Sequence, residues 1–227
     1  FGTLFNQIAN DNYVRIVNIS YGLNESYLNG FGLVSSWHSI FNQMLGQGMT
    51  IMAAAGDSGA TAGCGDSIAL LYPGSDPDVV SVGGTALQTS IYGFSSEVAW
   101  TGGTSTGSCS HNNGGTGGGC SVLFSAPGYQ SSPACGSGSR SIPDIALNAA
   151  VGQNYYFNGG LHGVGGTSIS SPMTSGFMAQ ENAYLLAIGV GCGSGYGSTC
   201  SPVGQVNYQI YYNGYNPTYA PHYPFYD

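Results

Sequence analysis

Charged side chains are scarce in this sequence: Asp, Glu, Lys and Arg together make up 5% of its 227 residues, against about 25% in ordinary domains. Lysine is absent, and Arg15 and Arg140 are the two basic residues beside ten acidic ones. Nucleic-acid binding requires a basic face that displaces counterions from phosphates. Binding to an anionic membrane surface requires clustered basic residues. Two arginines therefore exclude both classes of partner.

The low charge also bears on the medium in which the protein works. The formal net charge is −8 at pH 7, and it approaches zero in acid, where carboxylates take up protons. The chain thereby avoids the self-repulsion that many basic groups would cause there. We interpret this composition as adaptation to an acidic medium, with a surface solvated by small polar residues and 17 tyrosines. The alternative is a surface covered by glycans or partner subunits.

Metal-binding cysteine patterns are missing as well. None of the six cysteines forms a Cys-x-x-Cys pair, and no cysteine or histidine cluster has zinc spacing. Disulfides in an oxidising compartment are the favoured interpretation. Cys109–Cys120 and Cys192–Cys200 would each close a short loop, although six cysteines allow many other connectivities.

Long hydrophobic runs are lacking too, and no segment reaches the length of a transmembrane helix. With the disulfides, this places the protein outside the cell or on its surface. The chain begins and ends abruptly, so we expect it to be part of a longer, processed precursor.

Apolar patterning predicts an α/β fold. Residues 32–47 carry apolar side chains on one helical face, and helices are also expected at 4–10 and from Ser168 to about residue 188. Apolar, β-branched runs predict buried strands. These strands are expected at residues 14–19, 49–54, 67–72, 79–82, 145–147 and 154–158. Strand, helix and strand in this order imply a parallel sheet. Long loops are expected at 101–141, and irregular structure in the tyrosine-rich stretch from Val206.

Two polar motifs stand where predicted strands end, which is where open α/β sheets bind ligands. Gly56-Asp57-Ser58-Gly59 directly follows the strand at 49–54, and Gly165-Gly166-Thr167-Ser168 opens the last long helix. Ser168 is a candidate nucleophile, because a helix N-terminus offers amide donors and positive potential to an oxyanion. Asp57, in its protonated form, would donate a hydrogen bond to that oxyanion. Taken singly, Ser168 could be a helix N-cap and Asp57 a turn residue.

Six blocks in order resemble the sedolisins, the serine-carboxyl peptidases, over nearly the whole chain. The blocks are Val17-Asn18-Ile19-Ser20-Tyr21-Gly22 with Glu25; Ala54-Ala55-Gly56-Asp57-Ser58-Gly59-Ala60; Tyr72-Pro73-Gly74-Ser75-Asp76-Pro77 with Val79-Val80-Ser81-Val82-Gly83-Gly84-Thr85; Glu97, Trp100 and Gly118-Gly119-Cys120-Ser121 with Pro127-Gly128-Tyr129-Gln130; Arg140-Ser141-Ile142-Pro143-Asp144-Ile145; and Gly165-Gly166-Thr167-Ser168 with Pro172.

The resemblance implies a subtilisin-like three-layer fold, with a mostly parallel central sheet and helices on both faces. It further implies hydrolysis of peptide bonds in acid, through an acyl-enzyme on Ser168. In this family a glutamate is the general base, a second aspartate orients it, and Asp57 would serve the oxyanion. The implied partners are protein or peptide substrates and a propeptide or the remainder of the same precursor.

The chain departs from the family pattern in two places. The family's Glu-x-x-x-Asp helix has no match before Val14, so the base and its orienting aspartate are expected upstream of Phe1. Residues 1–227 are therefore interpreted as a partial sedolisin-type peptidase domain, which would be inert alone. The family also has a calcium site that opens with an aspartate after an aromatic segment. Asp227 resembles that aspartate, which implies bound Ca²⁺ with further ligands beyond the chain.

Three alternatives stay open. A subtilisin-type His/Asp/Ser peptidase would place asparagine where Asp57 stands. A catalytically inactive sedolisin-like domain, with a structural or cell-surface assembly role, fits the missing base and the tyrosine-rich tail. A carbohydrate-binding module would use the tyrosines but leaves the two glycine-rich motifs unexplained.

The remaining titratable residues are expected to be structural. The four histidines are interpreted as surface or loop residues, and Glu25 and Glu97 as structural or subsite residues. Turn or cap roles are expected for Asp66, Asp76, Asp78 and Asp144.

Overall fold

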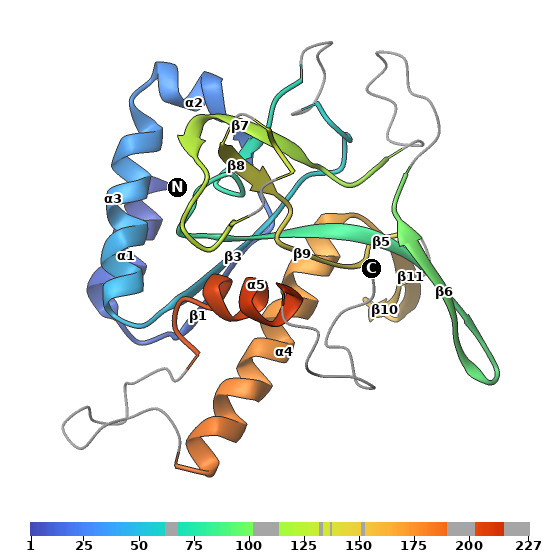
Figure 1. The fold of residues 1–227 in the computed structure, drawn as a ribbon. Helices are drawn as coiled ribbons and strands as arrows, with labels where there is room; N and C mark the ends of the chain where they lie inside the picture. The colour runs from blue at the N-terminus through green and yellow to red at the C-terminus, as the bar shows by residue number, and fades with distance from the viewer. Residues whose placement is uncertain are drawn as a thin grey trace.

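A five-stranded sheet organises the chain in the computed structural model, which describes residues 1–61, 68–101, 114–131, 134–136, 138–150, 153–189 and 203–215 (Figure 1). Three strands pair in parallel in the order β1 (Ile16–Ile19), β3 (Thr50–Ala54) and β5 (Val80–Ser90). β5 also pairs in parallel with β9 (Ile145–Asn148) and antiparallel with β6 (Gly93–Ala99); these two strands lie on opposite edges of β5, because Thr85 pairs with Asn148 on one side and with Ala99 on the other. The predicted parallel sheet is confirmed.

Helices cover both faces of this sheet. On one face lie α1 (Gly2–Asp11) and α3 (Leu33–Gly46), which pack against each other (Figure 1). On the other face α4 (Thr167–Ala187) contacts β1, β3, β5 and β9, and α5 (Asn207–Tyr215) packs beside it. These three layers are the predicted α/β arrangement.

The central strand β3 explains why the sheet is stable between two helical layers. All five of its residues are buried, as expected for a parallel strand covered on both faces. Ile51 packs into the cluster formed by α1 and α3, whereas its neighbour Met52 packs into the cluster on the α4 side. The alternation of side chains along one strand thus supplies two cores.

Short elements surround the sheet. They are β2 (Leu23–Asn24) paired with β4 (Leu71–Tyr72), α2 (Glu25–Gly30), β7 (Gly119–Ser125) paired with β8 (Ser139–Ile142), and the hairpin of β10 (Gln153–Phe157) and β11 (Gly160–Val164). None of the helices in the described part of the chain has the length and apolar character needed to cross a membrane.

Four expectations need correction. The strand expected at 67–72 is reduced to the two residues of β4. The expected loop region 101–141 contains β7 and most of β8, and the described part of the stretch from Val206 contains the helix α5. The cysteine pairing is also different: Cys120 bonds Cys135, which excludes the pair Cys109–Cys120. Cys192–Cys200 lies outside the described residues.

Candidate active site

Ser168 lies at the second residue of α4, exposed to solvent, where the helix begins beneath the carboxyl ends of the parallel strands. The residue before the helix, Gly166, has φ 98°, a backbone conformation that side chains with a Cβ rarely adopt. A Cβ on Gly166 would also meet Asp57 Oδ2 at 2.5 Å. Glycine at this position therefore allows the loop of Asp57 to lie directly against the start of the helix.

Thr167 joins the two motifs that the sequence predicted to act together. Its backbone N–H donates to Asp57 Oδ1 at 2.7 Å, and its hydroxyl donates to the same oxygen at 2.8 Å. The Thr167 hydroxyl also accepts from the Gly56 N–H at 3.0 Å. Asp57 and Ser168 are thus held on one hydrogen-bonded frame. Sequence reasoning missed Thr167 in this role, although it stands between the two residues of the Gly-Thr-Ser motif that were singled out.

A second segment supports the Asp57 loop from the opposite side. The Gly115 N–H donates to the Asp57 carbonyl at 3.0 Å, and the Gly117 N–H donates to the Gly56 carbonyl at 2.7 Å. A Cβ on Gly117 would overlap the Ala55 carbonyl oxygen. Gly117 lies in the region where the sequence predicted only loops, and glycine is required there because the two backbones approach so closely.

The end of β1 holds the first turn of α4 through a chain of three side chains. The Ser171 hydroxyl donates to Asn18 Oδ1 at 2.6 Å, and the Asn18 amide donates to the Ser20 hydroxyl at 3.0 Å. Ser20 then donates to the backbone carbonyl of Ser168 at 3.1 Å. The nucleophile candidate is thereby tied to β1 across about 150 residues of sequence.

The end of β9 provides a third anchor. The buried Ser170 hydroxyl donates to the Leu147 carbonyl at 3.1 Å. Together with Thr167 and Ser20, this bond fixes the helix start against three separate strands, so the position of Ser168 is set by the sheet and not by a flexible loop.

The arrangement places an exposed hydroxyl, that of Ser168, at the same helix start as the carboxyl group of Asp57. Asp57 Oδ1 accepts hydrogen bonds from both Thr167 donors, and no donor in the described residues reaches Oδ2. A proton on Oδ2 would therefore make Asp57 a donor to an oxyanion. No histidine or carboxylate of the described residues bonds the Ser168 hydroxyl. Two glutamates bond other residues: Glu25 accepts from the Ser121 hydroxyl, and Glu97 accepts from the Thr85 hydroxyl.

Glu25 and Asp144 show two different outcomes for the residues expected to be structural. Glu25 is buried and accepts from the Ser121 hydroxyl and the Val122 N–H, both at 2.8 Å, which confirms a structural role.

Asp144 lies in the bend between β8 and β9, as expected, and Oδ2 accepts from the Ser81 N–H at 2.8 Å, but its side chain also forms an ion pair that the sequence did not predict. Both of its oxygens pair with Arg140 at 2.5 Å, and both side chains are fully buried. Burial alone would lower the pKa of Arg140, but the charge and hydrogen bonds of Asp144, with smaller contributions from Tyr129 and Tyr211, together outweigh it and raise that pKa.

His38 also differs from its expectation as a surface residue. It lies half-buried on α3, and its Nδ1 is 3.0 Å from both oxygens of the buried Asp76. Asp76 keeps the predicted turn role as well, because Oδ1 accepts from the Asp78 N–H at 2.9 Å. The hydrogen bond to Asp76 raises the pKa of His38, and burial, with the Asp76 charge, raises the pKa of Asp78. His162 is exposed, as expected, whereas His111, His222 and Asp66 lie outside the described residues.

Calcium binding was expected at Asp227, which lies outside the described residues, so it stays a prediction. Within them, one group could hold a cation: His38, Asp76 and Asp78. Calcium takes roughly six to eight oxygen ligands, and this group offers an imidazole with two carboxylates. The oxygens of Asp76 already contact His38 Nδ1 and accept hydrogen bonds from the Asp78 N–H and, at 2.8 Å, from the Tyr72 hydroxyl. The group does not fit calcium.

Comparison with known proteins agrees with this geometry. A model of the subtilase family matches residues 4–185. Sedolisin of Pseudomonas sp. (strain 101) is 34% identical over 211 residues, which cover 87% of this chain and 35% of that protein. Xanthomonalisin of Xanthomonas sp. (strain T-22) is 34% identical over 214 residues, covering 82% of this chain and 26% of that protein.

The fold is shared with a solved relative. The structure of Pseudomonas sedolisin complexed with two molecules of pseudo-iodotyrostatin matches with a TM-score of 0.75 at 30% identity, over 92% of this chain and 55% of that one. The chain spans between about a quarter and about a third of the length of these two curated relatives. It belongs to the subtilase family, as a sedolisin-type member with the subtilisin-like α/β fold.

Proposed function

We propose that this chain carries the nucleophile and the oxyanion-binding aspartate of a sedolisin-type serine peptidase. Its substrates are proteins or peptides, and it works outside the cell in an acidic medium. The observation that carries the proposal is the frame built by Thr167, which holds the exposed Ser168 and Asp57 at one helix start.

The proposed first step is attack of the Ser168 hydroxyl oxygen on the peptide carbonyl carbon. The hydroxyl proton passes to a carboxylate base, and the carbonyl oxygen becomes an oxyanion. Asp57, protonated on Oδ2, donates a hydrogen bond to it, and the amides of the first turn of α4 add positive potential. Collapse releases the amine, which takes up the proton, and leaves an acyl-enzyme on Ser168.

The base in this proposal is the glutamate that the family resemblance implies, supplied from beyond residues 1–227. A carboxylate base remains active at a pH where histidine is protonated, which supports acid operation. The low content of charged residues and the Cys120–Cys135 disulfide support an extracellular, acidic setting. The calcium ion that the resemblance places at Asp227 belongs to the same proposal.

Asp57 allows a sharp test, because asparagine can copy one of its two forms. In the full-length protein, Asp57→Ala should lower kcat by roughly 10²- to 10³-fold, as expected for loss of one oxyanion donor. Asp57→Asn keeps an acceptor for Thr167 and presents an N–H donor that needs no protonation. It should retain more activity than the alanine variant, and its activity should extend to higher pH.

Ser168→Ala should abolish cleavage of a peptide substrate in acid, whereas Ser39→Ala, an exposed serine on α3, should leave it unchanged. Undiminished cleavage by Ser168→Ala would refute the proposal. A full-length wild-type protein that folds but cleaves no peptide between acid and neutral pH would instead favour the inactive, structural alternative.

A further inference from the structure

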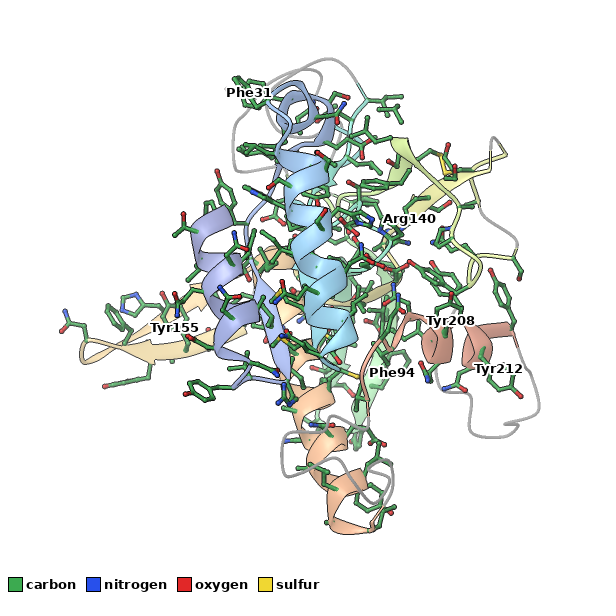
Figure 2. The ribbon with its side chains drawn as sticks, turned by 90° about the vertical axis from the view of Figure 1, so that its left-hand side faces the viewer. Phe31, Phe94, Arg140, Tyr155, Tyr208 and Tyr212 are labelled. Atoms are coloured by element: carbon green, nitrogen blue, oxygen red, sulfur yellow. A yellow bond between two sulfur atoms is a disulfide. The ribbon has the colours of Figure 1, made fainter. Side chains whose placement is uncertain are left out.

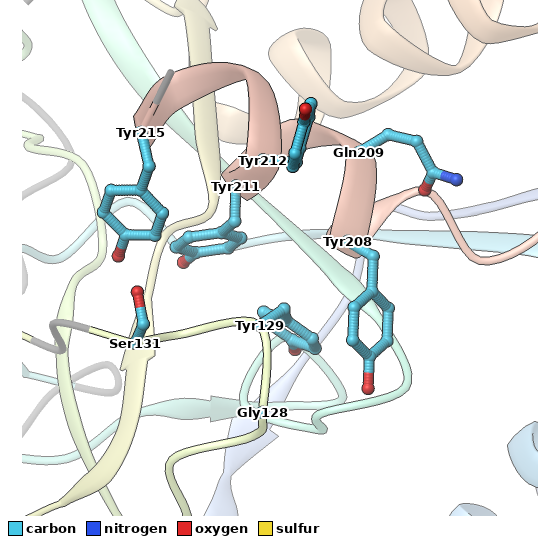
Figure 3. A pocket seen from close by; sticks show the side chains of 8 residues that line it. All are labelled: Gly128, Tyr129, Ser131, Tyr208, Gln209, Tyr211, Tyr212 and Tyr215. Atoms are coloured by element: carbon cyan, nitrogen blue, oxygen red, sulfur yellow. The ribbon is translucent and has the colours of Figure 1, made fainter.

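The tyrosine-rich helix α5, which the proposed peptidase mechanism does not use, forms one wall of a pocket. The pocket has a volume of about 480 Å³, within the usual range for ligand sites. It lies between α5 and the loop that starts at Gly128 (Figure 3). We call it the tyrosine groove; its aromatic lining consists of Tyr129, Tyr208, Tyr211, Tyr212 and Tyr215. Ser168 and Asp57 do not line it.

The rings form a continuous row along the groove. Ring centroids are 5.3 Å apart for Tyr208 and Tyr129, 5.1 Å for Tyr129 and Tyr211, and 6.0 Å for Tyr211 and Tyr215. Figure 3 shows these four rings following one another between α5 and the facing loop. The row exists because α5 places its tyrosines three and four residues apart, on one helical face.

Buried contacts hold the two inner rings in place. The Tyr129 hydroxyl donates to the Pro77 carbonyl at 2.8 Å and accepts from the Asn207 amide at 3.0 Å. The Tyr211 hydroxyl donates to Asp144 Oδ1 at 2.8 Å. Burial raises the pKa of both phenols, so both rings stay neutral. Behind them Arg140 lies inside the molecule, 5.7 Å from the centre of the Tyr129 ring (Figure 2). The rings are thus preorganised.

The outer rings are open to a ligand. Tyr208 is 53% exposed and Tyr215 is 46% exposed, and Figure 2 shows Tyr208 and Tyr212 on the surface of α5. The other polar side chains among the described lining residues are Ser131 and Gln209, and none of these described residues carries a charge. An ionised ligand would lose solvation there without gaining a counter-charge. The groove therefore suits a neutral ligand with flat apolar faces.

We propose that the tyrosine groove binds a proline-rich peptide segment in the polyproline II conformation. Aromatic-lined grooves are the general means of recognising such segments, because the ligand is extended in advance and loses little entropy on binding. Polyproline II makes one turn in three residues, about 9 Å, and the exposed Tyr208 and Tyr215 lie seven residues apart on α5, about 10 Å along the helix axis. Pyrrolidine rings on one face of the ligand can therefore pack against these two tyrosines at the open ends of the row.

The hydrogen-bonding groups favour this ligand over a sugar. Proline residues offer carbonyl acceptors and no N–H donors, and hydroxyl and amide donors of Ser131, Gln209 and the outer tyrosines can meet them. A sugar presents several hydroxyl donors that need acceptors, and the described lining residues offer no carboxylate, only the hydroxyls of Ser131 and the outer tyrosines and the amide oxygen of Gln209. The Tyr129 and Tyr211 hydroxyls already donate into the protein. Sugar hydroxyls left unpaired in the groove would cost binding free energy.

The test is calorimetric titration of the full-length protein carrying Ser168→Ala with acetylated and amidated decaproline. This variant cannot cleave the probe by the proposed mechanism, so the result is separate from the proposed peptidase activity. We expect saturable binding at a 1:1 ratio. Tyr208→Ala and Tyr215→Ala should each weaken it roughly three- to tenfold, the range of one aromatic contact.

Tyr156→Ala is the matched control, because this tyrosine is 74% exposed on β10 and lies outside the groove. It should leave decaproline binding unchanged, and all variants should keep the wild-type melting temperature, since the replaced rings are exposed. Absence of saturable binding at about 1 mM peptide, equal binding of a Gly-Ser peptide of the same length, or binding insensitive to the groove variants would overturn the proposal. So would preferential binding of the neutral oligosaccharide chitohexaose at the same tyrosines.

Discussion

Thr167 offers the most direct test of how the candidate active site is held together. Its hydroxyl makes two bonds, one to Asp57 Oδ1 at 2.8 Å and one from the Gly56 N–H at 3.0 Å, and the residue is fully buried. Thr167→Val keeps the shape of the side chain and removes both bonds. Thr167→Ser keeps both bonds and removes the methyl group.

The magnitudes of the two substitutions differ. In Thr167→Val the buried Gly56 N–H loses its partner, which costs about 1–3 kcal/mol. The lost bond to Asp57 adds about 1 kcal/mol, because Asp57 is exposed and water can replace the donor. The free energy of unfolding should fall by about 2–4 kcal/mol in total. Thr167→Ser should lose about 1 kcal/mol, the usual cost of one buried methyl group.

Urea denaturation and peptidase kinetics of the full-length protein measure the two effects. Thr167→Val should also lower kcat, since Asp57 keeps only the backbone donor and its side chain gains freedom, while Thr167→Ser should stay near wild type. Equal losses of stability and of kcat in the two variants would refute the reasoning, because the hydroxyl would then contribute nothing beyond the volume of the side chain.

Two further predictions concern charged pairs away from Ser168. The hydrogen bond to Asp76 raises the pKa of His38 in the folded state. The pair therefore contributes stability that is fully present below about pH 6.5 and is lost as the pH rises through the folded pKa. The difference in melting temperature between wild type and His38→Gln should be larger at pH 5 than at pH 8, and an equal difference at both pH values would contradict this prediction. Asp144→Asn leaves the buried Arg140 without its counter-charge and should reduce the free energy of unfolding by about 3–5 kcal/mol in denaturant titrations, whereas a loss below about 1 kcal/mol would show that the pair is solvated.

Where periodicity is strong, the fold follows from the sequence. The helix expected at 32–47 is α3, since apolar residues at helical spacing bury one face against the sheet. The strand at 49–54 is β3, because an uninterrupted apolar run suits a strand covered on both faces. The two motifs that carry Asp57 and Ser168 could also be found from the sequence, because the end of a strand and the start of a helix are recognisable from local sequence. The parallel sheet then brings both to the same edge.

The missed elements depend on distant contacts that no local pattern reveals. Helix α5 is rich in Tyr and Asn, and it is fixed by the burial of Asn207 and Ile210 against the sheet. Strand β7 runs through a glycine-rich stretch, and buried Glu25 fixes it by accepting from Ser121 and Val122. Thr167 was overlooked because its neighbours Gly166 and Ser168 explained the motif without it.

The three anchors of the α4 start determine when, during folding, the proposed nucleophile Ser168 reaches its final position. Ser20, Thr167 with Asp57, and Ser170 draw on β1, β3 and β9, whose sequence positions span most of the chain. Parallel pairings between such distant segments form slowly, after the intervening loops have closed. A partly folded chain therefore does not present Ser168 in its working position. The same bonds that place the proposed nucleophile also delay it, so that under the proposed function proteolytic activity would arise only when the fold is complete.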